Sequence, residues 1–332
     1  MKTRILGKTN LAVTELALGG LFVSEIGGEF AQSKAAVEHA LAAGINTIDT
    51  APGYGNSETV LGKILAGVRQ PLIISTKLGY KPEPFAPQNP DCLRRSLENS
   101  LKLLGRDHID ILMVHEPDRQ GQFAWWTDLE NFTGPVLDTL DQFKREGKIR
   151  FTGVGGTTAY ELAQVMGTGR FDVVLTAFNY SLLWREAERA ILPTAKRLGM
   201  GVIIGSPLQQ GSLARRFDAE VADPRRCRWL SPPRRAQFQA LYAYLDEINL
   251  PIAEAGLRFV LSNPDVHCVL MGARSAEEVE SNVASVKKGP LTQEVLKRLD
   301  AIAAMVPFHP YEEPFNLPFQ TDTIRTIGHA GR

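Results

Sequence analysis

The sequence has few cysteines and no recognisable metal-binding motif. It contains three cysteines in 332 residues, Cys92, Cys227 and Cys268, which lie far apart and are odd in number. This pattern argues against a disulfide framework and against a zinc site built from cysteines. No pair of histidines has metal-ligand spacing of the HExxH kind, so we predict no metal site.

Long apolar runs and an excess of one charge are also missing. No run approaches the roughly 18 residues of a membrane span, and the opening MKTRILGKTN becomes polar too soon for a signal peptide. The 37 basic and 37 acidic side chains cancel, so there is no general attraction to nucleic acid or to an anionic membrane. We therefore expect a soluble, cytoplasmic protein, with monomer and homo-oligomer both left open.

A dinucleotide-binding fingerprint is absent as well. Glycines follow the first predicted strand in LALGGLFVSEIGG, but without GxGxxG spacing at the start of a helix. What the sequence does contain is an alternation of short apolar runs with amphipathic segments of helical period. The eight apolar runs that we predict as strands are 16–19, 45–49, 71–77, 108–114, 149–155, 171–177, 201–206 and 267–272.

The segments between these strands carry helix start and stop signals. Residues 33–44 have apolar side chains at helical spacing and stop on a glycine, and 89–105 begins Asn-Pro-Asp and also ends on a glycine. Buried parallel strands joined by helices fit either a (β/α)8 TIM barrel or a doubly wound sheet. Eight such units in 332 residues, without the dinucleotide fingerprint, favour the barrel. We predict one barrel domain over 1–332, with an N-terminal β-hairpin that plugs its bottom. Extended loops are expected at about 116–134 and 209–235, and a tail from about 305.

Polar side chains lie at the ends of three successive predicted strands. Asp49 ends the second strand and Tyr54 lies in the loop beyond it, Lys77 ends the third strand, and His115 ends the fourth. Each has a simpler explanation when taken alone: a turn residue, a solvated lysine, a core histidine. Because the carboxyl ends of barrel strands meet at the rim where barrel enzymes carry out their chemistry, the four together predict a catalytic site.

These residue types suit proton transfer to an oxygen atom. A free tyrosine has a pKa of about 10, which makes it a reluctant acid at neutral pH. A neighbouring ammonium group such as Lys77 lowers that pKa, provided that a carboxylate such as Asp49 holds the lysine in place. His115 can orient a carbonyl oxygen or help to move a proton.

Six segments carry these residues in order: ILGKTNLAVTELALGG, INTIDTAPGYGNSETVLGKIL, IISTKLG, DHIDILMVHEPD, KREGKIRFTGVG and VLMGARSAEEVESN. In them the chain resembles the aldo-keto reductase family over nearly its whole length. The resemblance implies a barrel that binds NADPH or NADH without a Rossmann motif and transfers hydride to or from a small-molecule carbonyl or alcohol. It also implies that Tyr54 is the general acid/base, that Lys77 and Asp49 tune it, and that His115 positions the substrate.

The cofactor is expected to extend to the segment after the eighth strand. Ser275 and Glu278 have capping-box spacing, and the helix N-terminus that they open can hold an anion. Arg274 favours the 2′-phosphate of NADPH, whereas a carboxylate at Glu278 either favours NADH or is only a helix cap; we favour NADPH and leave NADH open. The cofactor contacts predicted with the help of the resemblance are Gly20, Leu21, Asp49, Thr176, Ser206, Leu208, Gly211, Gly272, Arg274, Glu278 and Asn282.

The nicotinamide end departs from the family pattern. The usual Ser-Asn after the fifth strand is Gly155-Gly156, and the tyrosine that commonly stacks on the ring is Gly205. The usual glutamine at the end of the sixth strand is read as Thr176. The candidates to replace these contacts are Thr157, Thr176 and Asn179. In this loss of the usual nicotinamide contacts, the chain resembles the branch of the family that oxidises sugars such as L-galactose, L-fucose and D-threo-aldoses.

The substrate pocket is predicted from aromatic residues expected at the rim, namely Phe22, Tyr54, His115, Trp125 and Trp126. Aromatic faces suit either the C–H face of a sugar or an apolar carbonyl compound. On the four residues at three successive strand ends, we predict an NAD(P)-dependent oxidoreductase that interconverts a carbonyl and an alcohol, on a sugar or polyol. Two other classes remain as alternatives. One is a regulatory subunit that binds cofactor with little turnover, and the other is a barrel isomerase or aldolase with a Schiff base at Lys77.

Overall fold

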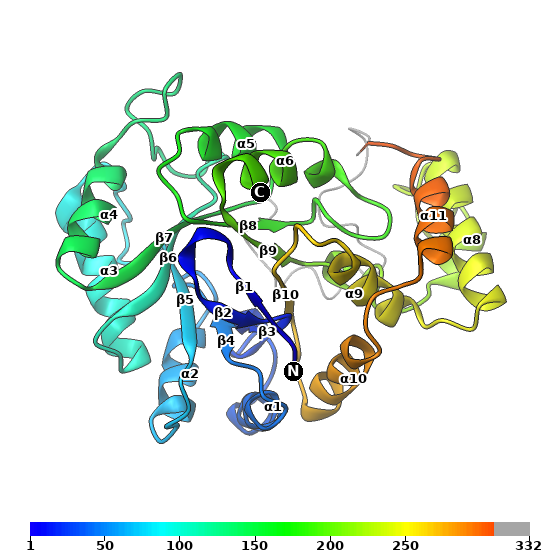
Figure 1. The fold of residues 1–332 in the computed structure, drawn as a ribbon, viewed down its shortest axis with the longest axis horizontal. Helices are drawn as coiled ribbons and strands as arrows, with labels where there is room; N and C mark the ends of the chain where they lie inside the picture. Colours follow the sequence, from blue (N-terminus) through cyan, green and yellow to red (C-terminus); the bar gives the residue numbers. More distant parts are fainter. Residues whose placement is uncertain (309–332) are drawn as a thin grey trace.

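The structure, a computed structural model, describes residues 1–308; the rest of the predicted C-terminal tail, 309–332, lies outside the described residues. Eight parallel strands close into a barrel in the order β10-β3-β4-β5-β6-β7-β8-β9, enclosed by helices (Figure 1). The prediction of a (β/α)8 barrel is therefore confirmed. The barrel strands are β3 (Leu16–Gly19), β4 (Thr47–Asp49), β5 (Ile73–Leu78), β6 (Ile109–His115), β7 (Ile149–Gly156), β8 (Val173–Ala177), β9 (Gly201–Gly205) and β10 (Cys268–Met271).

The helices follow the strands with local signals that the sequence provides. In α3 the Asn89 side chain accepts hydrogen bonds from the backbone N–H of Asp91 (2.9 Å) and Cys92 (3.4 Å), and Gly105 ends the helix with φ +63°. The helices are α1 (Phe30–Ala42), α2 (Ser57–Leu65), α3 (Pro90–Leu104), α4 (Pro135–Arg145), α5 (Tyr160–Gly167), α6 (Ile191–Leu198), α7 (Asp218–Ala222), α8 (Pro232–Glu247), α9 (Ile252–Ser262), α10 (Ala276–Lys287) and α11 (Gln293–Ala303).

Helix α1 begins three residues earlier than the predicted 33–44. Glu29 and Gln32 form a reciprocal capping box, in which each side chain accepts a hydrogen bond from the other residue's backbone N–H. The prediction followed the apolar positions and missed this box, because its partners are glutamate and glutamine rather than the usual serine or threonine.

The N-terminal hairpin closes the amino end of the barrel, as predicted. Strands β1 (Thr3–Ile5) and β2 (Ala12–Thr14) pair antiparallel, and Leu6, Leu11 and Val13 pack against inward-facing barrel side chains such as Ile203. A methyl group added at Gly201 would lie 2.5 Å from Cγ of Leu6, so β9 can start there only with glycine. The other end of the barrel is left for the loops that carry chemistry.

The long segment 209–235 is not a loop throughout. It contains the short helix α7, and α8 begins inside it at Pro232, where Ser231 caps the helix by accepting from the N–H of Arg234 (3.4 Å). The Arg235 guanidinium donates to the carbonyls of Val221 (2.5 Å) and Cys227 (3.0 Å), which fastens the segment to α8.

Helices α8 and α11 lie side by side at one flank of the barrel (Figure 1). The Gln237 amide of α8 donates to the carbonyl of Ile302 at 2.9 Å. All three cysteines are free and buried. Over residues 1–308 no helix is long and apolar enough to cross a membrane.

Candidate active site

A cavity of about 450 Å³ opens at the carboxyl ends of the barrel strands. The structure brings most of the predicted site residues to its wall. Those that line it are Asp49, Tyr54, Lys77, His115, Phe22, Gly20, Leu21, Ser206, Leu208, Gly211, Gly272, Arg274, Glu278 and Asn282. Gly272, Arg274, Glu278 and Asn282 come from the segment after β10, where the sequence predicted the far end of the cofactor site.

Asp49 and Lys77 form a buried ion pair at the ends of β4 and β5. The Lys77 ammonium donates to Oδ2 of Asp49 (2.7 Å) and to the carbonyl of Thr50 (2.8 Å), and both side chains are almost fully enclosed. The other Asp49 oxygen accepts from the Ser75 hydroxyl at 2.8 Å. Since Asp49 and Ser75 are register partners in adjacent parallel strands, the strand pairing itself holds this arrangement.

Tyr54 lies in the loop after β4, with the Lys77 ammonium 4.8 Å from the centre of its ring. Burial raises the pKa of Tyr54; the charge of Lys77 opposes this, and the charges of Asp49 and Glu116 add to it. Lys77 therefore lowers the pKa of Tyr54, as the sequence led us to expect. The other effects outweigh it, and the pKa of Tyr54 lies above its usual value. The phenol stays protonated through the neutral range.

Lys77 itself is held in the charged form. Burial lowers its pKa, but the charges of Asp49 and Tyr54 and the hydrogen bonds with both raise it, and the pKa ends above the usual value. A Schiff base requires a neutral, nucleophilic amine with a lowered pKa. The charged state of Lys77 therefore does not support the alternative of an isomerase or aldolase that forms a Schiff base at Lys77.

His115 packs between two aromatic rings. The imidazole meets the rings of Tyr54 and Tyr80 edge-on, with centroids 5.8 and 5.2 Å apart. Burial, together with the positive charge of Lys77, holds the pKa of His115 well below its usual value. The imidazole is therefore neutral at physiological pH and can donate or accept a hydrogen bond without carrying charge.

The loop after β9 has an unusual backbone. Ser206, Gln210 and Gly211 line the cavity with φ values of +49°, +51° and +105°. The side-chain amide of neighbouring Gln209 donates to the carbonyl of Phe178 at 2.7 Å, which ties this loop to the one after β8. Turns in the left-handed region expose backbone N–H groups in concave arrangements that suit phosphate oxygens.

The start of α10 forms the far end of the cavity. Ser275 caps the helix by accepting from the N–H of Glu278 (3.3 Å), and the Glu278 carboxylate accepts from the N–H of Arg274 (2.8 Å). The Arg274 guanidinium lies 4.2 Å from the centre of the Phe22 ring. Glu278 is thus engaged as a cap, while Arg274 presents positive charge at the cavity.

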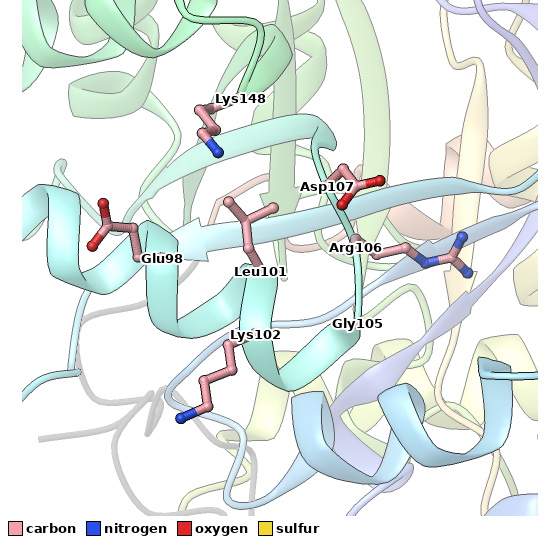
Figure 2. A pocket seen from close by; sticks show the side chains of 7 residues that line it. All are labelled: Glu98, Leu101, Lys102, Gly105, Arg106, Asp107 and Lys148. Carbon is pink, nitrogen blue, oxygen red and sulfur yellow. The ribbon is translucent and has the colours of Figure 1, made fainter.

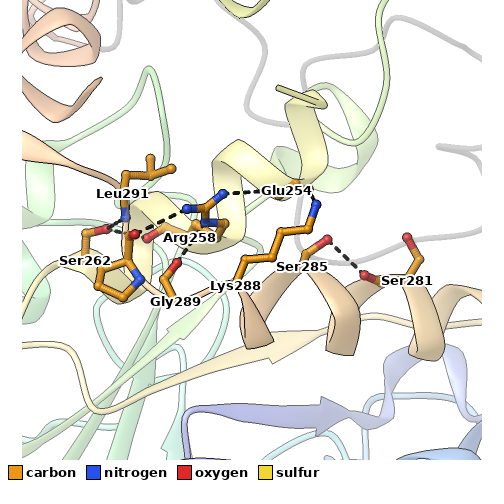
Figure 3. Close-up of polar contacts among 9 residues, drawn as sticks. Glu254, Arg258, Ser262, Ser281, Ser285, Lys288, Gly289 and Leu291 are labelled. Carbon is orange, nitrogen blue, oxygen red and sulfur yellow. Dashed lines mark hydrogen bonds and ion pairs between the residues drawn. The ribbon is translucent and has the colours of Figure 1, made fainter. Parts of the chain in front are cut away.

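Helices α9 and α10 make the wall beside this end, through Ala253, Leu257, Ser281 and Asn282. Behind that wall, Glu254 accepts hydrogen bonds from Arg258 (2.7 Å) and from Lys288 (2.6 Å), as Figure 3 shows. Because Lys288 directly follows α10, the buried Glu254 carboxylate joins the two helices that line the cavity.

Three predicted contacts are not found at the cavity. Thr176 is fully buried on the outer side of β8, where its hydroxyl accepts from Asn179 (3.0 Å). Side chains alternate along a strand, so Ala177 lines the cavity in its place. Trp125 and Trp126 are 1% and 7% exposed and pack within the loop core, Trp125 against Phe85.

Gly156, the last residue of β7, is explained by a carboxylate that the sequence analysis passed over. A methyl group at Gly156 would lie 2.7 Å from both carboxylate oxygens of Asp118, which accepts from the N–H groups of Thr157 (2.9 Å) and Thr158 (2.7 Å). Asp118 occupies the space that a side chain at 156 requires. Of the three proposed substitutes, Thr157 lines the cavity, and Thr176 and Asn179 do not.

The cavity residues that the sequence analysis missed include Tyr80, Glu116, Phe178 and Gln210. Glu116 directly follows His115, and Tyr80 lies two residues after β5, so the strand-end rule that found Lys77 and His115 also points to them. Phe178 and Gln210 have positive φ values, and the local sequence does not predict this backbone conformation.

A second pocket lies at the opposite end of the barrel. It is lined by Glu98, Leu101, Lys102, Gly105, Arg106, Asp107 and Lys148, next to the starts of β6 and β7. Figure 2 shows its charged groups pointing away from one another rather than converging on one point. A ligand site needs convergent polar groups, so we assign no function to this pocket.

Comparison with known proteins agrees with this geometry. The model of the "Aldo/keto reductase family" matches residues 16–304. L-galactose dehydrogenase of Arabidopsis thaliana is 30% identical over 317 residues, covering 91% of this chain and 94% of that protein. A putative voltage-gated potassium channel subunit beta of Schizosaccharomyces pombe is 27% identical over 333 residues, covering 92% and 94%.

The fold also matches a solved structure. An aldo-keto reductase from Bacillus halodurans, in its holo form, superposes with a TM-score of 0.74 at 24% identity, covering 94% of this chain and 99% of that one. Since the family model covers most of the chain and a relative at 30% identity covers nearly all of it, the chain belongs to the aldo/keto reductase family of oxidoreductases.

Proposed function

We propose that the protein is an NAD(P)-dependent oxidoreductase that interconverts a carbonyl and an alcohol, with Tyr54 as general acid/base, on a sugar or polyol. The observation that carries this is the buried Asp49–Lys77 pair set against Tyr54 and neutral His115 in one cavity. The cofactor, when bound, supplies or accepts the hydride. The likeness to L-galactose dehydrogenase supports the sugar-type substrate.

The four residues divide the work of moving one proton. In reduction, the carbonyl oxygen gains negative charge, and protonated Tyr54 donates to it. The Lys77 ammonium stabilises the phenolate left behind, and Asp49 and Thr50 keep that ammonium in place. Neutral His115 positions the carbonyl oxygen by a hydrogen bond. In oxidation, the phenolate takes the proton of the alcohol.

The cavity suits a dinucleotide along its length. The left-handed backbone from Ser206 to Gly211 suits the phosphates, and the α10 N-terminus with Arg274 suits a further anionic group. Thr157 takes the place of the missing contacts to the nicotinamide carboxamide. The Glu278 carboxylate is used as a cap at the start of α10, and the positively charged Arg274 guanidinium lies at the same end of the cavity. We therefore favour NADPH, with its 2′-phosphate, over NADH.

The choice of cofactor is tested by Arg274→Ala. Loss of a charged contact to the 2′-phosphate lowers kcat/KM for NADPH by about 10- to 100-fold, and changes that for NADH much less. Steady-state kinetics with both cofactors measures this. Glu278→Gln is the matched control, because it keeps the acceptor for the Arg274 N–H but removes the negative charge. An equal loss with both cofactors in Arg274→Ala would contradict a 2′-phosphate contact.

The adenosine end also depends on Glu254, which acts from behind the cavity wall. We expect Glu254→Gln to loosen α9 from α10 and to raise the Kd for the whole cofactor by about three- to tenfold. Binding of nicotinamide mononucleotide, which lacks the adenosine half, stays the same. Titration followed by tryptophan fluorescence measures both ligands. An equal loss for both would show a general structural defect instead.

The proposed function itself is tested by NAD(P)H turnover on a panel of carbonyl compounds and by dehydrogenase assays on free sugars. Turnover with at least one class is expected. The alternative, a regulatory subunit with little turnover, is raised by the likeness to the potassium channel subunit. Tight cofactor binding without turnover on any member of either panel would favour that alternative.

A further inference from the structure

Glu116 is a buried carboxyl group in the cavity wall that the proton transfer above does not use. It follows β6 directly, next to His115, and is 5% exposed. Its Oε2 has no hydrogen-bond partner within residues 1–308, although it is shielded from solvent. Buried polar atoms in folded proteins nearly always have a partner. An unpaired acceptor in the wall of a ligand cavity indicates that the ligand brings the donor.

The backbone at Glu116 is also exceptional. Its φ is +50°, in the left-handed region that non-glycine residues avoid, and Tyr80 in the same wall has φ +65°. The N–H of Glu116 donates to the carbonyl of Gly155 at 2.7 Å, so the conformation is fastened to β7. Backbone strain of this kind persists where the surroundings enforce it, and it gathers at functional sites.

The neighbours of Glu116 make this part of the wall polar. Gln122 donates to the Tyr80 hydroxyl, and Arg119 donates to the Thr157 hydroxyl at 2.5 Å. Burial raises the pKa of Glu116 and the charge of Asp118 adds to this, whereas the charge of Arg119 and hydrogen bonds with Gln122 and Thr157 lower it. The charge of Glu116 in turn acts on Tyr54, so the carboxyl group lies within electrostatic range of the reacting phenol.

We propose that Glu116 is a specificity-determining residue whose carboxyl group accepts a hydrogen bond from a substrate hydroxyl. It thereby selects hydroxylated carbonyl compounds, the chemical class of sugars, over plain aldehydes of the same length. This inference rests on the proposed function, because Tyr54 and His115 mark where the carbonyl lies. A site built to bond a hydroxyl discriminates strongly against the analogue that lacks it, since the buried acceptor is then left unpaired.

The experiment compares kcat/KM for glyceraldehyde and for propanal, which have the same carbon chain. In Glu116→Leu the ratio of the two values falls by about 10- to 100-fold, the range for a hydrogen bond to a charged group. In Glu116→Gln, whose amide oxygen still accepts a hydrogen bond, the ratio falls less. Cofactor affinity, measured by fluorescence titration, stays the same.

The matched control is Glu25→Leu. Glu25 is an exposed carboxylate beside Gly55 that does not line the cavity, so the ratio stays at its wild-type value. An unchanged ratio in Glu116→Leu, or an equal loss with both aldehydes, overturns the inference and identifies the carboxyl group as structural. If the wild type turns over neither aldehyde nor any other carbonyl compound, it is the proposed function that fails.

Discussion

Tyr54→Phe should lower kcat for carbonyl reduction by about a thousandfold while cofactor affinity stays within a factor of two or three. The phenyl ring keeps the shape of the site and the edge-on contact with His115, but it has no proton to give. Single-turnover kinetics with a good substrate, together with a fluorescence titration of the cofactor, measures the two effects separately. If kcat survives undiminished, Tyr54 is not the acid.

The pH dependence of reduction and of oxidation is a second test of the role of Tyr54. Because the pKa of Tyr54 lies above its usual value of 10.0, reduction, which needs the phenol, stays level on the alkaline side up to about pH 10. Oxidation needs the phenolate, so its rate rises with pH over that range. The rise of the oxidation rate with pH should disappear in Tyr54→Phe.

Lys77→Met is the other change with a large expected effect, and it acts on both activity and stability. Without the ammonium, the phenolate of Tyr54 loses its stabilising charge, and we expect kcat to fall by about 100- to 1000-fold. The variant also leaves the Asp49 carboxylate buried without its cation, which lowers the free energy of unfolding by about 3–5 kcal/mol. Denaturant unfolding and steady-state kinetics measure the two losses.

The double variant Asp49→Asn/Lys77→Met separates these two losses. Replacing the carboxylate by an amide removes the unpaired charge, so most of the stability returns, whereas activity does not. If activity returned with stability, Lys77 would be a structural residue rather than part of the proton transfer. In the wild type, the pKa of Lys77 is raised, so the stability from the pair is fully present below about pH 10.5 and is lost only as the pH rises through that raised pKa.

The barrel and the catalytic end of the site were predictable because strand ends obey a simple rule. Every predicted strand exists, and the polar residues that end β4, β5 and β6 meet in one cavity. Register explains this result: parallel pairing sets Asp49 opposite Ser75 and brings the end of each strand to the same rim. Hydrophobic period and strand order were enough to place these side chains.

Other parts of the site depend on contacts that sequence spacing does not reveal. The side chains at 176 and 177 face opposite sides of β8, so a shift of one residue moved the predicted contact out of the cavity. Trp125 and Trp126 lie in a long loop, where no period indicates whether a ring faces the cavity or the loop's own core. Gln122 and Thr157, which hydrogen-bond with the Glu116 side chain, follow different strands and meet only in the folded chain.

The contact between Asp118 and Gly156 has a consequence for how this chain can vary. A larger residue at 156 would collide with the carboxylate that holds the turn into α5, and a smaller residue at 118 would leave the N–H groups of Thr157 and Thr158 without their acceptor. Neither position can therefore change freely by itself. Restoring the family's usual asparagine at 156 requires a simultaneous replacement at 118, so the two positions should be designed, and should drift among close relatives, as a pair.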